Sequence, residues 1–306
     1  MKKNLFLLAA SALALSACGE HKHADGHTDA DHAAMSSKDA AKGHDHAGMN
    51  MPGMDMSKGG HHHGAATLKV ALTSAGAFTP GKAQAVALML TDAKTGAPIG
   101  PNDLELVHTK KLHLLIIDES LTDYQHIHPV PGTKAGEWVF TFTPKFARTY
   151  RVWADSTRSG ADQEYVFADL PAGSQKAPAP DANPVATAEL NGLKFALSFD
   201  GAVKAGKGVM GSVAVIDTKS GKPFTQLQPI MGAFGHVVAF SRDWGSIEHV
   251  HPLGSEPTKD SDRSGPVIGF HMQPANSGVL KIFVQILANG KETIVPFTVN
   301  VEAGTR

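Results

Sequence analysis

The 306-residue chain has a single cysteine, Cys18, close to its start. One thiol excludes a disulfide framework within the chain. It also excludes a cysteine-ligated blue-copper centre in the folded part, because such centres need a thiolate ligand. The formal net charge is only −1, so no excess of basic residues favours binding to nucleic acid.

Long hydrophobic runs are scarce as well. Residues 5–17 are apolar but too few to span a bilayer as a mature helix. They follow Lys2 and Lys3, as the apolar region of a signal peptide does, which makes residues 1–17 the predicted signal peptide. An ordinary secretory signal is one reading of this segment.

The end of this segment, Leu15-Ser16-Ala17-Cys18, resembles the lipobox of bacterial lipoproteins. The resemblance implies cleavage before Cys18, lipid on Cys18 and export across the inner membrane. Gly19 rather than Asp follows the cysteine, which in that family points to the periplasmic face of the outer membrane over the inner membrane. Acyl chains contribute about 0.8 kcal/mol per buried CH₂ to such anchoring.

Residues 18–64 contain almost no apolar residues besides methionine and alanine, so they are predicted to be disordered. Nine of the 17 histidines fall here, together with clustered methionines. Imidazole suits Cu(II), Ni(II) and Zn(II), whereas thioether selects Cu(I). The segment resembles the Met/His-rich tracts of periplasmic copper-resistance proteins, and a soluble spacer is the alternative. Its candidate ligands are Met49, Met51, Met54, Met56, His61, His62 and His63.

From residue 67 onwards, short segments alternate apolar and polar residues between glycines and prolines, and no amphipathic helix is evident. A Pro-rich linker at residues 171–184 precedes a second copy of the pattern, offset by 123 to 130 residues. The chain is therefore predicted to be all-β, with two tandem antiparallel β-sandwiches of immunoglobulin-like or cupredoxin-like type. They would span residues 65–170 and 185–306.

Each copy contains a predicted β-hairpin with three histidines in the same frame. These are His113, His126 and His128 in the first copy, and His236, His249 and His251 in the second. Alternation along a strand puts the His-x-His pair on one face, and a turn centred near Leu121 would place His113 opposite His128. Each trio is predicted to hold one metal ion.

Apolar residues share the face of these histidines: Leu115 and Ile117 beside His113, and Val238 and Phe240 beside His236. If that face belongs to a core, the histidines lie at its rim. Weaker ligand candidates are His108, Met231 and His271. The competing interpretation is that the histidines bond to backbone at strand ends and the methionines fill the core.

The favoured function is that of a metal-handling lipoprotein that sequesters or delivers copper, with zinc and nickel as alternative ions. Its partners would be the membrane and metal efflux or delivery proteins. An adhesion or scaffold module is an alternative, since a sandwich fold alone does not define function. An enzyme with a three-histidine metal is the other alternative. It is disfavoured because no acid/base or nucleophile motif accompanies the histidines.

Overall fold

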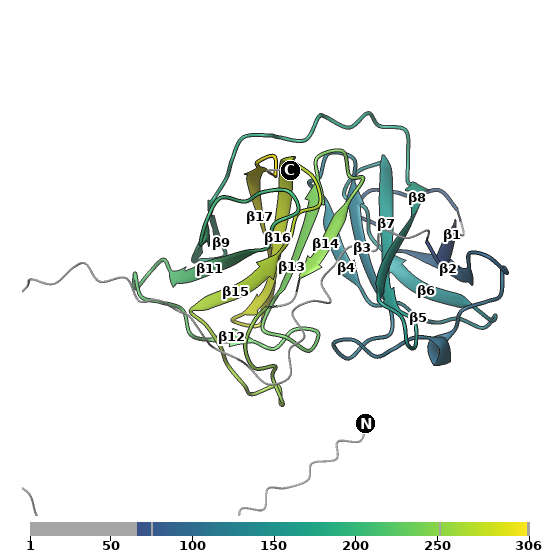
Figure 1. Ribbon diagram of the computed structural model, residues 1–306, viewed down its shortest axis with the longest axis horizontal. Helices are drawn as coiled ribbons and strands as arrows, with labels where there is room; N and C mark the ends of the chain where they lie inside the picture. Colours follow the sequence, from purple (N-terminus) through teal and green to yellow (C-terminus); the bar gives the residue numbers. More distant parts are fainter. Residues whose placement is uncertain (1–65, 75, 251, 305–306) are drawn as a thin grey trace, which may run out of the picture. The chain divides into compact units, whose positions relative to one another are not determined.

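The computed structural model describes residues 66–74, 76–250 and 252–304, and these residues form two tandem antiparallel β-sandwiches without an α-helix (Figure 1). The predicted fold class is confirmed. The signal segment, the Met/His-rich tract, Cys18 and His251 lie outside the described residues. Within those ranges, none of the secondary structure is a helix with the length and hydropathy to cross a bilayer.

The first sandwich has two four-stranded sheets, in the orders β1-β2-β6-β5 and β4-β3-β7-β8. A 3-10 helix, η2 (Pro101–Asp103), lies between β2 and β3. The strands are β1 (Leu68–Ser74), β2 (Gln84–Asp92), β3 (His113–Asp118), β4 (Tyr124–Ile127), β5 (Val130–Pro131), β6 (Glu137–Phe142), β7 (Thr149–Thr157) and β8 (Gln163–Pro171).

The second sandwich repeats this plan with sheets in the orders β15-β11-β10-β9 and β12-β16-β13-β14, and β17 also pairs with β16. The strands are β9 (Thr187–Leu190), β10 (Leu193–Phe199), β11 (Val209–Asp217), β12 (Leu227–Gln228), β13 (His236–Ser241), β14 (Ile247–Val250), β15 (Val267–Met272), β16 (Gly278–Ala288) and β17 (Lys291–Val301).

Each sandwich encloses its own apolar core, built by the alternation that the sequence shows. In β2, Val86, Leu88 and Leu90 point inward while their neighbours are partly exposed. These residues pack in one cluster with Leu114 and Ile116 of β3. The second sandwich has a corresponding cluster of its own.

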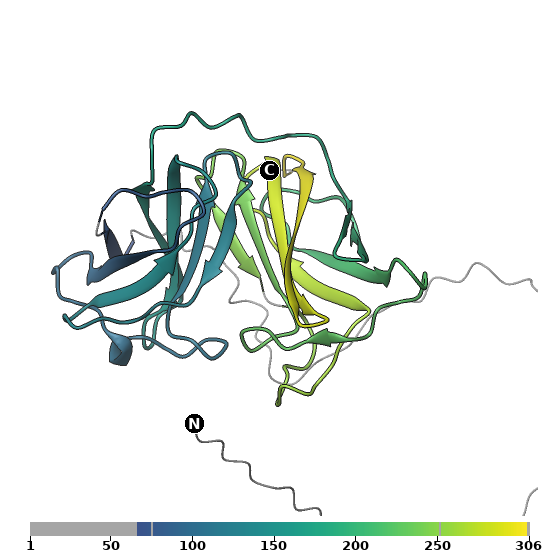
Figure 2. The same ribbon diagram turned by 180° about the vertical axis from the view of Figure 1, so that it is seen from behind.

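Strand β3 departs from this alternation because every one of its six residues is buried. One face covers the core of the first sandwich, and the other contributes to a third apolar cluster that joins the two sandwiches. Figures 1 and 2 show the β3–β4 hairpin beside β13 and β14 from both sides. Burial on both faces explains why the strand is an almost unbroken apolar run.

The joining cluster is built from equivalent residues of the two repeats, which makes the contact a near-symmetric one within a single chain. Its matched pairs, first repeat before second, are Leu115 and Val238, Ile117 and Phe240, Leu121 and Trp244, Tyr124 and Ile247, Trp153 and Phe283, and Tyr165 and Ile294.

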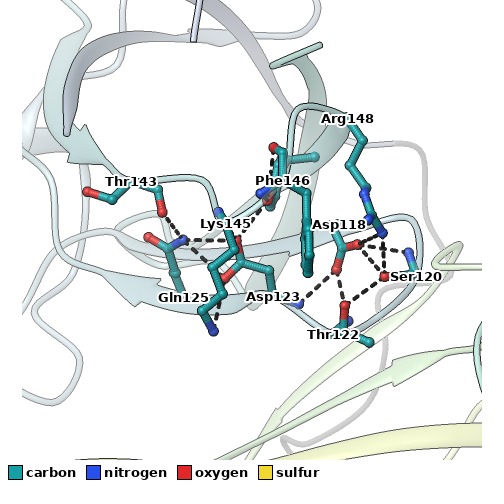
Figure 3. Close-up of polar contacts among 10 residues, drawn as sticks. Asp118, Ser120, Thr122, Asp123, Gln125, Thr143, Lys145, Phe146 and Arg148 are labelled. Atoms are coloured by element: carbon teal, nitrogen blue, oxygen red, sulfur yellow. Dashed lines mark hydrogen bonds and ion pairs between the residues drawn. The ribbon is translucent and has the colours of Figure 1, made fainter. Parts of the chain in front are cut away.

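A buried carboxylate organises the turn of the first hairpin (Figure 3). Asp118 accepts hydrogen bonds from the backbone N–H groups of Ser120, Thr122 and Asp123, and from the Ser120 hydroxyl. Arg148 lies 3.0 Å from the same carboxylate. This network fixes the turn, whose residue Leu121 has φ of 55°, and so fixes where β4 begins.

Candidate metal centre

The observed hairpin register places the histidines of the first repeat on one face. Leu114 pairs with Ile127 and Leu115 with His126, so the same register carried one residue further sets His113 opposite His128. In the second repeat Val237 pairs with Val250 and Val238 with His249. His126 and His249 therefore occupy equivalent places on the two hairpins.

Three ring nitrogens of the first repeat converge. His113 Nδ1 lies 3.3 Å from His126 Nε2 and 3.2 Å from His128 Nε2. Two nitrogens bound to one tetrahedral ion with bonds of about 2.0–2.1 Å would lie about 3.3–3.4 Å apart. The spacing of these nitrogens thus matches that of ligands on a single ion.

Histidines of the second repeat join the same cluster. His126 groups with His236 and His249, with one ring nitrogen of each within 4.8 Å of the others. The ring centroids of His126 and His249 are 5.1 Å apart, and those of His113 and His249 are 5.4 Å apart. The sequence predicted a separate trio in each half, but the described histidines of both halves meet in one place between the sandwiches.

Backbone carbonyls orient two of these rings. His113 Nε2 donates to the Val107 carbonyl at 3.1 Å, and His236 Nε2 donates to the Ile230 carbonyl at 3.1 Å. Val107 and Ile230 stand in equivalent turns just before β3 and β13. A carbonyl can only accept, so the proton lies on Nε2 and Nδ1 carries the lone pair in both rings.

Polar side chains orient two more rings, and they do so across the contact between the repeats. His249 Nδ1 lies 2.6 Å from an Asp155 carboxylate oxygen, and His126 Nδ1 lies 3.2 Å from Gln285 Oε1. Asp155 pairs with His113 in its own sheet, just as Gln285 pairs with His236. Each repeat therefore supplies the acceptor for the other repeat's histidine.

A further pair of side chains supports these acceptors. Gln163 donates to Asp155 at 2.8 Å, and the Gln285 amide donates to Glu292 at 2.7 Å. Gln163 and Glu292 occupy equivalent positions on β8 and β17. Such hydrogen-bond partners behind histidine ligands fix tautomer and ring orientation at metal sites.

The cluster favours neutral imidazoles. Burial lowers the pKa of His128 to about 3 and that of His236 to about 4. Burial likewise lowers the pKa values of three other rings, namely His113, His126 and His249. Neutral imidazole is the form that binds metal ions.

Asp155 is buried with the histidines, and burial raises its pKa to about 6. It therefore remains mainly ionised at neutral pH and accepts the proton of His249 Nδ1. The polar residues Asp155 and Gln285 were not identified from the sequence. The sequence does contain a signal for them, because each copy has a polar residue two positions after the matched residues Trp153 and Phe283.

The weaker histidine candidates, His108 and His271, are not members of these two groups. His108 Nδ1 lies 3.0 Å from a Glu256 carboxylate oxygen, and Met231 takes the equivalent place in the turn of the second repeat. His271 is on β15, paired with Met210, in the sheet that does not contain β13 and β14. Neither histidine belongs to the sets whose ring nitrogens converge.

One family model matches both sandwiches, over residues 63–168 and 188–303, and its description is a domain of unknown function (DUF8832). The chain belongs to the DUF8832 family. It carries two copies of the family's domain, in agreement with the duplication seen in the sequence. A comparison with curated proteins finds no match.

Solved structures with similarity include Escherichia coli alpha-2-macroglobulin in three states. The trypsin-activated form is 11% identical with a TM-score of 0.25, and the elastase-activated form is 13% identical with a TM-score of 0.24. The native form is 12% identical, also with a TM-score of 0.24. The alignments cover 76–78% of this chain but only 14–20% of those chains, so it spans a small part of their length.

Proposed function

We propose that this protein binds a transition-metal ion, copper before zinc or nickel, through the histidine cluster between its two sandwiches, and that it has no catalytic role. The main support for this proposal is that His113 Nδ1 lies 3.3 Å from His126 Nε2 and 3.2 Å from His128 Nε2. The hydrogen bonds to Val107 and Gln285 leave the lone pairs of His113 Nδ1 and His126 Nε2 facing each other. Two neutral imidazoles in this arrangement repel unless a cation or an added proton lies between them, and burial disfavours the added proton because it would charge a ring.

The nitrogen ligands favour a metal ion of intermediate softness. Nitrogen ligands suit Cu(II), Zn(II) and Ni(II), while hard ions such as Mg²⁺ and Ca²⁺ prefer oxygen. We prefer copper among these ions because the segment before residue 66 combines histidines with Met49, Met51, Met54 and Met56. Thioether ligands select Cu(I), so the whole chain offers ligands for both copper redox states.

The proposed setting is the cell envelope. The lipobox-like ending at Cys18 would anchor the protein by lipid, on the periplasmic face of the outer membrane. There the tract would capture ions and the cluster would hold them, for sequestration or for transfer to efflux or delivery proteins. Replacing Cys18 by Ser is expected to move the protein from the membrane fraction to the soluble fraction. Continued membrane association would refute the lipid anchor.

Metal binding is tested by competition with chromophoric chelators for Cu(I), Cu(II), Zn(II) and Ni(II), using the full chain. His126→Ala should weaken the tightest binding by at least about 10-fold, because His126 belongs to both sets of converging ring nitrogens. His271→Ala is the matched control, since this half-buried histidine lies in the other sheet. Equal affinities for the wild type and His126→Ala would contradict the proposal.

A further inference from the structure

The two sets of converging histidines overlap. We propose that they form two alternative positions for a single metal ion, which are occupied one at a time because both require His126. The outer position is made by His113, His126 and His128, and the inner position by His126, His236 and His249. This inference rests on the proposed metal-binding function and concerns how the cluster holds its ion.

The hydrogen bonds of His126 explain why only one of the two metal positions can be occupied at a time. The Gln285 amide nitrogen donates to the carboxylate of Glu292 at 2.7 Å, which fixes the orientation of the amide. Its oxygen, Oε1, therefore faces His126 Nδ1 at 3.2 Å. An amide oxygen can only accept a hydrogen bond, so Nδ1 carries the proton of the neutral ring.

A neutral imidazole protonated on Nδ1 has one lone pair, on Nε2. This is the nitrogen that lies 3.3 Å from His113 Nδ1, within the outer set. The inner set must use the same nitrogen, because the ring offers no other lone pair. One lone pair binds one ion, so the two positions compete for His126.

The two positions differ in their surroundings. The outer position includes His128, which is partly exposed and lines a surface pocket beside Val130 and Phe140. In the inner position His236 is 0% and His249 6% exposed, with the Asp155 carboxylate behind His249. An ion arriving at His128 can exchange His113 and His128 for His236 and His249 while it keeps His126 as a ligand.

This arrangement suits a cation that is satisfied by three nitrogen ligands and exchanges them readily. The outer position would accept the ion from solvent or from a donor. The inner position would retain it away from water, with a carboxylate nearby to balance its charge. The shared histidine would make the transfer stepwise, without release of the ion.

Counting ions tests the proposal. The full chain is saturated with Zn(II), and bound ions are counted by native mass spectrometry for the wild type and for variants. The tract before residue 66 is the same in each protein, so differences report on the cluster. His128→Ala and His236→Ala should each keep the wild-type count, because one position survives. The double variant and His126→Ala should each bind one ion fewer.

Other results separate the two proposals. Loss of two ions in His126→Ala would leave metal binding standing and overturn exclusive occupancy. Loss of one ion in His128→Ala alone, with no change in His236→Ala, would remove the inner position. Loss of one ion in His236→Ala alone, with no change in His128→Ala, would remove the outer position. Loss of one ion in each of the three single variants, His126→Ala included, would show that neither position holds an ion by itself, and would also overturn the proposal. An unchanged count in all variants would overturn metal binding by the cluster itself.

If His126→Ala fails to fold, His126→Asn, a smaller polar side chain, replaces it, with folding checked by circular dichroism.

Discussion

Gln285 of the second repeat accepts a hydrogen bond from His126 of the first, with 3.2 Å between Oε1 and Nδ1. The reciprocal contact joins His249 of the second repeat to Asp155 of the first at 2.6 Å. Gene duplication has thus produced a chain in which each copy orients a histidine of the other. The two acceptors differ, because an amide faces His126 and a carboxylate faces His249.

Replacing Gln285 by Leu should weaken metal binding without removing a ligand. The substitution deletes the acceptor that holds the proton of His126 on Nδ1, and loss of such a partner typically costs about 10–100-fold in affinity. Affinity is measured by chelator competition. Gln125→Leu is the control, because Gln125 is next to His126 but bonds to the Thr143 carbonyl on the opposite face. Equal effects of the two variants would contradict this role of Gln285.

The apolar contact between the repeats should contribute strongly to stability. Phe240 is fully buried in the joining cluster, and Phe240→Ala is expected to lower the free energy of unfolding by about 3–5 kcal/mol. Chemical denaturation followed by tryptophan fluorescence measures this loss. Val267→Ala, at a side chain that is 52% exposed, should change it by less than about 0.5 kcal/mol. A loss below about 1 kcal/mol for Phe240→Ala would argue against a packed contact.

Arg151 stacks between aromatic rings of both repeats. Its guanidinium lies 3.9 Å from the Phe167 ring centroid and 4.5 Å from that of Trp244, and it donates to the Trp244 carbonyl. Arg151→Lys keeps the charge but loses the planar stacking, so a loss of about 1–2 kcal/mol is expected. Arg158→Lys is the control, because Arg158 pairs with Asp92. Equal losses in thermal unfolding would show that stacking contributes nothing.

The hairpin turn should show a pH dependence that comes from Asp118. Burial acts to raise the pKa of this carboxyl, but hydrogen bonds from the Ser120 hydroxyl and from the N–H groups of Asp123 and Thr122 outweigh it. The net pKa is lowered. A folded-state pKa below the unfolded value of about 3.9 means that the stabilisation is complete above that pH. It is lost as pH falls through the folded value.

Asp118→Asn should therefore cost about 3 kcal/mol at neutral pH, because it leaves the buried Arg148 without its counter-charge. The difference from the wild type should narrow below about pH 4. Ser241→Ala tests the equivalent position of the second repeat, where a serine bonds to Asp243, and a change below about 1 kcal/mol is expected. Urea unfolding across this pH range measures both. A difference that stays constant down to pH 2 would contradict the assignment.

Much of the fold could be predicted from one sequence because duplication repeats its signals. The alternation in the strands and the turn residues occurs twice, and the spacing of His113 to His128 defines a hairpin register that the structure shows. Local patterns suffice for such features, since strand faces and turns depend on near neighbours.

The docking of the two repeats could not be predicted from these patterns. Leu115 and Ile117 share a face with His113, and an apolar face is equally consistent with the core of one sandwich or with a contact between two. The convergence of His126 with His236 and His249 depends on that docking, as does the use of Asp155 and Gln285. These residues come from strands that are distant in sequence, and periodicity carries no information on which sheet faces which.

The most direct test of the metal centre is anomalous diffraction from crystals of the copper- or zinc-loaded protein, recorded at the absorption edge of the metal. An ion is expected at about 2.0–2.1 Å from His126 Nε2, with its other ligands drawn from one of the two neighbouring histidine pairs. Metal peaks elsewhere in the chain, with none bonded to His126, would contradict the account.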